Sequence, residues 1–210
     1  MIKVIIVDDH LIVREGLKQI ISDTSDISVV DEASNGQEAI NKIRNNDCDV
    51  LLLDISMPGR SGLEILKEIK SELPKLSILI LTMHPEEQYA VRVLRAGASG
   101  YLTKESAPDE LIEAIRKVSD GGKYISSTLA EKLAFNLEID TGKPFHQTLS
   151  DREFEVMCMI SSGKTVTEIA DEMSLSVKTI STYRTRILDK MRMKTNAELT
   201  YYSIKNDLVG

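Results

Sequence analysis

Residues 50–62 read VLLLDISMPGRSG and include the most hydrophobic predicted strand of the chain. The run from Val50 to Leu53 predicts a short strand that is buried on both faces, as in a parallel sheet covered by helices. Asp54 follows at once, and the proline and two glycines after it predict a sharp turn. Asp54 is therefore either the first residue of an ordinary turn or a carboxylate that the strand holds in place for chemistry.

The run at 50–54 is one of five β-rich runs in the first half of the chain. These runs cover residues 3–9, 27–33, 50–54, 77–82 and 100–104. Segments with apolar residues at helical spacing separate them. Asn35 and Pro108 stand at the predicted starts of two of these helices, and Gly97 stands at the predicted end of another. This alternation predicts an α/β fold in which a parallel sheet carries helices on both faces.

Polar side chains stand where these runs end. Asp8 and Asp9 end the first run, Asp54 ends the third, Thr82 ends the fourth, and Lys104 follows the fifth. Because the carboxyl ends of parallel strands meet at one edge of a sheet, we expect these side chains to converge. Three carboxylates repel one another unless a cation neutralises them, and all-oxygen ligands favour Mg2+. The set has the ingredients for phosphoryl transfer to a carboxylate.

Residues 1–122 resemble the receiver domain of two-component response regulators, which has a flavodoxin-like (βα)5 fold. The matching motifs keep the family's order and spacing. They are VDDH at 7–10, LLLDISMPGRSG at 51–62, LT at 81–82 and YLTK at 101–104. One of these motifs alone would be a weak signal, since an Asp at a strand end is usually a turn former. The four together are highly specific.

The resemblance implies a role for each of these residues. Asp54 would accept a phosphoryl group from a histidine kinase, Lys104 would pair with that group, and Thr82 would hydrogen-bond it. Tyr101 matches an aromatic residue that turns inward on activation. The implied Mg2+ ligands are Asp8, Asp9, Asp54 and the backbone carbonyl of Ser56. One position departs from the family: Glu105 stands where many receivers have a proline in a cis bond, a conformation that is costly for other residues.

The second half of the chain differs in charge and in pattern. The net charge of −7 lies entirely in residues 1–122, whereas residues 176–194 hold a strong excess of Lys and Arg. Residues 123–147 predict a linker, in which STLAEKLAFNL at 127–137 could form a short helix and the stretch after it has no helical or strand period. Residues 148–210 predict an all-α domain of four short helices. A basic, exposed helix after a tight turn indicates a helix-turn-helix, whose second helix lies in the DNA major groove.

Residues 148–208 closely resemble the LuxR-type helix-turn-helix of NarL/FixJ response regulators through LSDREFEV, EIA and SVKTISTYRTRILDKM, and the recognition helix is similar to that of BvgA and EvgA regulators. The resemblance implies contacts with the DNA backbone from Lys178, Thr179, Tyr183, Arg184 and Arg186. The implied groove-facing residues are Ser181, Thr182 and Thr185. The implied dimer contacts are Leu199, Tyr202 and Ile204.

We interpret the chain as a cytoplasmic, dimeric transcription factor controlled by phosphorylation, and not as an enzyme. The start, MIKVIIVDDH, is no secretory signal, and no stretch approaches the roughly 18 apolar residues of a membrane span. Cys48 and Cys158 lie far apart in the sequence, and we expect them to be free thiols and not a disulfide. One alternative is a regulator that binds DNA independently of phosphorylation and uses its receiver only for protein contacts. Another is a Mg2+-dependent aspartyl-phosphate hydrolase, but such enzymes usually carry a second Asp where Ser56 stands.

Overall fold

The computed structural model describes residues 1–126, 129–131 and 144–209. The chain divides into two compact units, Met1–Glu131 and Lys132–Gly210. No helix within the described ranges is long and apolar enough to cross a membrane. Cys48 and Cys158 are both free thiols, as the sequence predicts.

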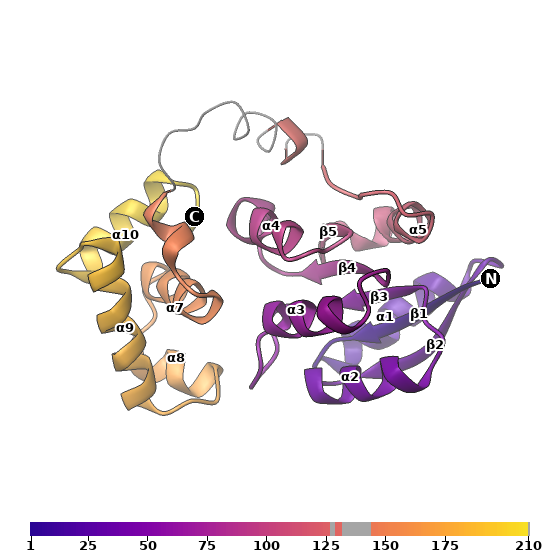
Figure 1. Ribbon diagram of the computed structural model, residues 1–210, viewed down its shortest axis with the longest axis horizontal. Coiled ribbons are helices and arrows are strands. Elements are labelled where there is room, and N and C mark those ends of the chain that lie inside the picture. Colours follow the sequence, from indigo (N-terminus) through magenta and orange to yellow (C-terminus); the bar gives the residue numbers. More distant parts are fainter. Residues whose placement is uncertain (127–128, 132–143, 210) are drawn as a thin grey trace. The chain divides into compact units, whose positions relative to one another are not determined.

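The first unit is a five-stranded parallel sheet in the order β2-β1-β3-β4-β5, which is the flavodoxin-like order that the sequence predicts. Its strands are β1 (Ile2–Val7), β2 (Ile27–Ala33), β3 (Val50–Leu53), β4 (Ser77–Thr82) and β5 (Gly100–Thr103). Its helices are α1 (Leu11–Ser22), α2 (Gly36–Asn45), α3 (Gly62–Glu72), α4 (Glu86–Arg95) and α5 (Ala107–Ser119). Figure 1 shows helices on both faces of the sheet, with α2 and α3 in front and α1 behind.

The middle strands are apolar because helices cover both of their faces. All four residues of β3 are buried, and so are Val4 to Val7 of β1 and Ile78 to Leu81 of β4. Local signals fix the helices between them. Asn35 caps α2 by accepting a hydrogen bond from the backbone N–H of Glu38, and a proline lies in the first turn of α5.

The glycines after β3 let the chain fold back against the strand end. Gly59 has a positive φ of 82°, which side chains other than glycine rarely adopt. A Cβ atom on Gly62 would lie 2.4 Å from both the carbonyl oxygen of Asp54 and the Cα of Ile55. Ser61 then starts α3 with a capping box. The turn in VLLLDISMPGRSG therefore packs closely against the backbone of Asp54.

The second unit is all-helical, in agreement with the sequence. It consists of a short 3-10 helix η1 (Phe145–Thr148) and the helices α7 (Asp151–Ser161), α8 (Val166–Glu172), α9 (Val177–Met191) and α10 (Asn196–Lys205). Ser150, Thr165 and Ser176 cap α7, α8 and α9 through their hydroxyl oxygens. Phe154 of α7 and Ile187 of α9 are buried between the helices.

Both ends of the predicted linker, residues 123–147, lie in packed structure. Tyr124 donates its backbone N–H to Ser99 and accepts one from Tyr101, and Leu129 is buried in the first unit. Phe145 and the residues after it form η1 of the second unit. Residues 132–143 lie outside the described residues, so the linker stays a prediction.

Candidate functional site

The predicted acidic residues meet at the carboxyl edge of the sheet. Val7 of β1 and Leu53 of β3 are paired neighbours, which brings Asp8 and Asp9 next to Asp54. Asp8, Asp9, His10 and Asp54 each offer one ligand atom, and these atoms all lie within 4.8 Å of one another. The sequence prediction did not include His10, whose Nδ1 lies 2.9 Å from Oδ1 of Asp9. Its position directly after the two acids was the available signal.

Lys104 lies between two of these carboxylates. Its Nζ is 2.6 Å from Oδ2 of Asp54 and 2.6 Å from Oδ2 of Asp8. Burial alone would lower the pKa of Lys104, but the two carboxylates outweigh it and raise the pKa, so the ammonium stays charged. Burial raises the pKa of Asp54 despite the attraction of Lys104. Asp54 is thus a buried carboxylate whose charge is only partly compensated.

The oxygen atoms of the cluster suit a hard divalent cation. One lysine charge is set against three carboxylates, which leaves the site negative. Oδ1 of Asp9 is buried, and apart from its contact with Nδ1 of His10 it has no hydrogen-bond partner among the described residues. Oδ1 of Asp54 accepts a hydrogen bond of 2.9 Å from the backbone N–H of Ser56, which places Ser56 beside the phosphoacceptor candidate. Carboxylate oxygens of this kind are ligands that Mg2+ prefers in proteins.

Thr82 and Tyr101 are both buried and both contact His84. Oγ1 of Thr82 lies 3.4 Å from the backbone N–H of His84, and the hydroxyl of Tyr101 donates a 2.8 Å hydrogen bond to the carbonyl of His84. Tyr101 therefore already points inward. The peptide bond between Lys104 and Glu105 is trans, since no cis bond occurs among the described residues.

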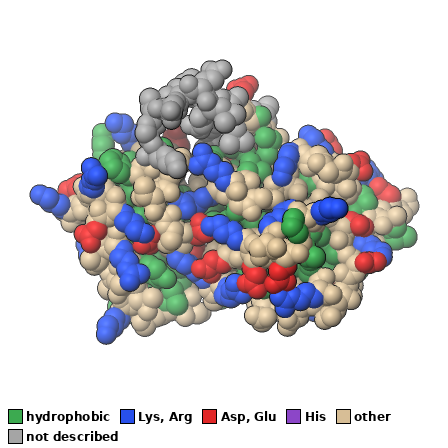
Figure 2. Space-filling model, viewed as in Figure 1, with side chains coloured by type: hydrophobic (Ala, Val, Ile, Leu, Met, Phe, Trp, Pro, Cys, Tyr) green, Lys and Arg blue, Asp and Glu red, His purple; other side chains and the backbone are tan. Residues whose placement is uncertain are grey.

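The helix α9 has one buried face and one accessible face. The buried residues are Ile180, Ile187, Leu188 and Met191. The exposed DNA-contact candidates are Lys178, Ser181, Thr182, Thr185 and Arg186. Thr179, Tyr183 and Arg184 are half-buried, and Nε of Arg184 donates a 2.7 Å hydrogen bond to Asn196 of α10. Figure 2 shows Lys and Arg side chains standing out from the helical unit.

The structure corrects one of the predicted dimer contacts. Leu199 is fully buried inside the helical unit and has no surface to offer a partner. Tyr202 is half-buried, and its hydroxyl lies 2.9 Å from Nδ1 of His146. Ile204 is 57% exposed, and Tyr201, which the sequence analysis did not select, is 71% exposed. The accessible apolar face of α10 therefore consists of Tyr201 and Ile204.

Comparison with known families gives the class of protein. Residues 4–116 match the response regulator receiver domain, and residues 147–203 match the bacterial regulatory proteins of the luxR family. The chain therefore belongs to the response regulators of the NarL/FixJ type, which join a receiver domain to a LuxR-type DNA-binding domain and regulate transcription.

Individual relatives cover both units of the chain. The response regulator UvrY of Escherichia coli K12 is 42% identical over 210 residues, which are 99% of this chain and 96% of UvrY. RcsB of Salmonella enterica serovar Typhimurium, bound to the promoter rprA in the presence of the phosphomimetic BeF3-, is 32% identical with a TM-score of 0.66. That match covers 96% of this chain and 98% of RcsB. A structure of two RcsB dimers on two parallel DNAs is 31% identical, covers 96% of each chain and has a TM-score of 0.60.

Proposed function

We propose that Asp54 is the phosphoacceptor and that its phosphorylation by a histidine kinase controls binding of DNA by α9. The observation that carries this proposal is the position of Lys104, whose Nζ lies 2.6 Å from carboxylate oxygens of both Asp54 and Asp8. Such a cation neutralises a phosphoryl group as it arrives at the carboxylate. The negative charge around it supports the proposal that a divalent cation takes part.

The chemistry is a transfer from a phosphohistidine to Asp54. A carboxylate oxygen of Asp54 forms the new bond to phosphorus, the P–N bond breaks, and its electron pair stays on the histidine ring, which takes up a proton. Lys104 then pairs with the phosphoryl oxygens. Mg2+, when bound by Asp8, Asp9, Asp54 and the backbone carbonyl of Ser56, supplies additional charge neutralisation for the transferred group.

The change in charge at Asp54 would reach the rest of the receiver through Thr82 and Tyr101. The hydroxyl of Thr82, which accepts from the backbone N–H of His84, is expected to donate its proton to the phosphoryl group, and a rotation toward that group would move the oxygen relative to His84. Tyr101 donates to the carbonyl of the same residue, so a shift of His84 changes both contacts. Differential contacts of this kind are what bias an equilibrium between two conformations.

The DNA-binding unit is proposed to act as a homodimer in the cytoplasm. We assign residues 1–122 to the receiver, 148–210 to the DNA-binding domain and 123–147 to the connection between them, whose two ends are packed in the units that they join. Lys178, Arg184 and Arg186 would contact phosphates, and Ser181, Thr182 and Thr185 would face the groove. The RcsB structures support this proposal because they hold RcsB dimers on DNA and RcsB on a promoter with BeF3-.

The test is the gain in DNA affinity on treatment with beryllofluoride and Mg2+. The probe is a duplex selected from a random pool by the treated protein. We expect tighter binding by the treated wild-type chain and no gain for Asp54→Asn. Asp47→Asn is the matched control, because it makes the same chemical change at a carboxylate whose side chain is 91% exposed. Its DNA affinity should rise on treatment as much as that of the wild type.

The alternatives are separate outcomes of the same test. Equal affinity of the treated and untreated wild type would indicate a regulator that binds DNA independently of phosphorylation. A full gain by Asp54→Asn would contradict the assignment of the phosphoacceptor. Rapid release of phosphate from acetyl phosphate with no gain in DNA affinity would instead indicate a hydrolase.

A further inference from the structure

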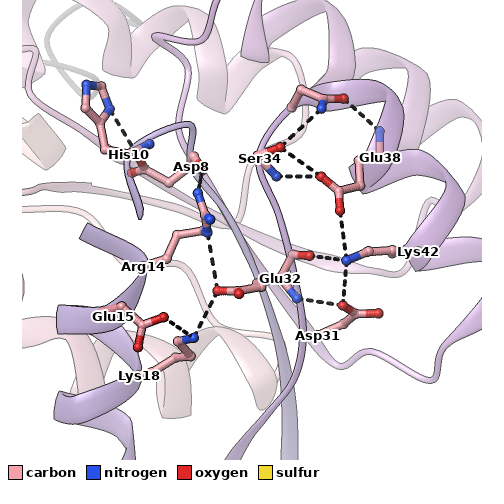
Figure 3. A network of polar contacts seen from close by, with 11 residues as sticks. Asp8, His10, Arg14, Glu15, Lys18, Asp31, Glu32, Ser34, Glu38 and Lys42 are labelled. Atoms are coloured by element: carbon pink, nitrogen blue, oxygen red, sulfur yellow. Dashed lines mark hydrogen bonds and ion pairs between the residues drawn. The ribbon is translucent and has the colours of Figure 1, made fainter. Parts of the chain in front are cut away.

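Arg14 is a buried cation next to the acidic cluster. The sequence motifs assign no role to it. It lies in the first turns of α1, and only 11% of its side chain is exposed. Its Nη1 donates a 2.7 Å hydrogen bond to the backbone carbonyl of Asp8. Its Nε lies 3.3 Å from a carboxylate oxygen of Glu32 in β2. One guanidinium thus joins the end of β1 to the neighbouring strand, as Figure 3 shows.

The carbonyl that Arg14 holds belongs to the peptide unit between the two acids. Because a peptide unit is planar, fixing the carbonyl oxygen of Asp8 also fixes the N–H and the Cα of Asp9. On the other side of the same residue, the backbone N–H of Asp8 donates to Ala33 at 3.1 Å, and its Oδ1 accepts from the N–H of His10 at 2.9 Å. Arg14 therefore completes the set of bonds that orients Asp8 and Asp9 relative to each other.

Arg14 itself is held in place by charged neighbours. Nζ of Lys18 lies 3.2 Å from Glu32 and 2.6 Å from Glu15, which ties Glu32 to α1 (Figure 3). Burial opposes the charge on Glu32, but Lys18 and Arg14 outweigh it and lower its pKa, so this carboxylate stays ionised. Glu32 compensates the charge of Arg14, which leaves the guanidinium to act on Asp8 mainly through its position.

We propose that Arg14 is a positioning residue for the divalent cation: it orients the carboxylates of Asp8 and Asp9 by holding the peptide unit between them. This inference rests on the proposed function, in which Asp8 and Asp9 are cation ligands. Arg14 does not touch the cation or the phosphoryl group. Replacing a residue that hydrogen-bonds to a metal ligand and orients it commonly lowers the metal affinity by about 10- to 100-fold.

The test is Mg2+ binding to the full-length chain, measured by isothermal titration calorimetry, with urea unfolding of each variant in parallel. We expect Arg14→Met to raise the dissociation constant by about tenfold in the folded protein. Arg14→Lys keeps the charge but not the two-point geometry, so it should lie between Arg14→Met and wild type. When Arg14→Met is phosphorylated by acetyl phosphate, the Mg2+ concentration that gives the half-maximal rate should be higher than for the wild type. The rate at saturating Mg2+ should stay near that of the wild type.

Lys42→Met is the matched control. Nζ of Lys42 lies 2.8 Å from Asp31 and 2.9 Å from Glu38, and it donates to the backbone carbonyl of Glu32 (Figure 3). The variant therefore breaks charged contacts of β2 but leaves the bond between Arg14 and Asp8 in place. Its dissociation constant for Mg2+ should stay within about twofold of wild type. An equal loss of affinity in Lys42→Met would overturn the inference, because general loosening of β2 would then explain the effect.

The remaining outcomes separate the inference from the proposed function. A folded Arg14→Met with the affinity of the wild type overturns the role of Arg14 and leaves the metal site standing. If Arg14→Met does not fold, Arg14→Lys decides in the same way. No measurable binding of Mg2+ by the wild type would overturn both the metal site and the role of Arg14.

Discussion

Asp54 is held between groups that act on its charge in opposite directions. Burial and the nearby Asp8 favour the neutral carboxyl, whereas Lys104 and the backbone N–H of Ser56 favour the carboxylate. The raised pKa of Asp54 shows that the first pair of effects is the larger. Without a bound cation, the charge of Asp54 therefore opposes folding.

We predict that Asp54→Asn stabilises the metal-free protein. Asparagine has nearly the same shape as aspartate but removes the charge that is unfavourable in this buried site. The free energy of unfolding at pH 7 should rise by about 1 kcal/mol, the size of an ordinary single-site effect. Urea unfolding in the presence of a chelator measures it. Asp47→Asn, at an exposed position, should change the free energy by less than about 0.5 kcal/mol, and an equal rise in both variants would contradict the explanation.

At the scale of single elements, α9 combines a buried face with an exposed polar face. Its apolar residues pack inside the helical unit, and Ser176 fixes its start by accepting a hydrogen bond from the N–H of Thr179. Lys178 stands exposed in the first turn. The N-terminal end of such a helix is the end that approaches base edges and phosphates in a helix-turn-helix.

Lys178→Ala should weaken binding to DNA of every sequence. A lysine that contacts a phosphate releases a counterion on binding, so its loss should lower the slope of log affinity against log salt by about 1. The measurement is a salt titration with both a selected and a random duplex. Lys75→Ala, which removes the same charge from an exposed position of the first unit, is the control. An unchanged slope for Lys178→Ala would remove Lys178 from the phosphate-contacting set.

Glu153 links α7 to α9 in the second unit. It accepts a 2.7 Å hydrogen bond from the N–H of Ser150 in the capping box, and it lies 2.6 Å from Nζ of Lys190. Its side chain is only 4% exposed. Burial would raise the pKa of this carboxyl, but Lys190 and Ser150 outweigh burial and lower the pKa.

Glu153→Gln should therefore destabilise the protein in a pH-dependent way. A carboxyl with a lowered pKa in the folded state stabilises the fold above its ordinary pKa of about 4.5, and this contribution is lost as the pH falls further. At pH 7 we expect the free energy of unfolding of the second unit to fall by about 1–2 kcal/mol. Urea unfolding at pH 7 and pH 3 measures the difference. A loss of equal size at both pH values would contradict the role of the ionised carboxyl.

At the scale of the whole molecule, the proposed homodimer needs an accessible apolar surface. Tyr201 and Ile204 of α10 are both exposed and lie three residues apart, which places them on one face of the helix. Two copies of this face would cover each other in a symmetric dimer. We therefore expect α10 to contribute through these two residues and not through Leu199.

Ile204→Ser should weaken dimer formation without unfolding the chain. Covering an isoleucine contributes about 1–2 kcal/mol and a symmetric dimer covers two, so the dissociation constant of the dimer on DNA should rise roughly 30- to 800-fold. Analytical ultracentrifugation with the selected duplex measures it. Lys205→Ser changes the neighbouring exposed residue and serves as the control. An unchanged dimer in Ile204→Ser would show that α10 is not the interface.

The sequence alone determined the sheet and the edge on which its polar residues meet. Parallel strands place all their carboxyl ends on one edge, so reading where five apolar runs end was enough to group Asp8, Asp9, Asp54, Thr82 and Lys104. The start of a helix such as the one after Asn35 also followed from the sequence, because a capping residue acts on N–H groups only three residues away. These features depend on neighbours along the chain or on strand order.

Only the tertiary structure decided which side chains position the cation ligands and which helix faces are covered. Arg14 is one of many arginines by sequence, and its role comes from reaching the carbonyl of Asp8 and the side chain of Glu32 on another strand. In α10, apolar residues lie on more than one face, so periodicity could not tell that Leu199 is buried and Tyr201 exposed. Packing against α7 settles which face is covered, because burial depends on partners that are distant in sequence.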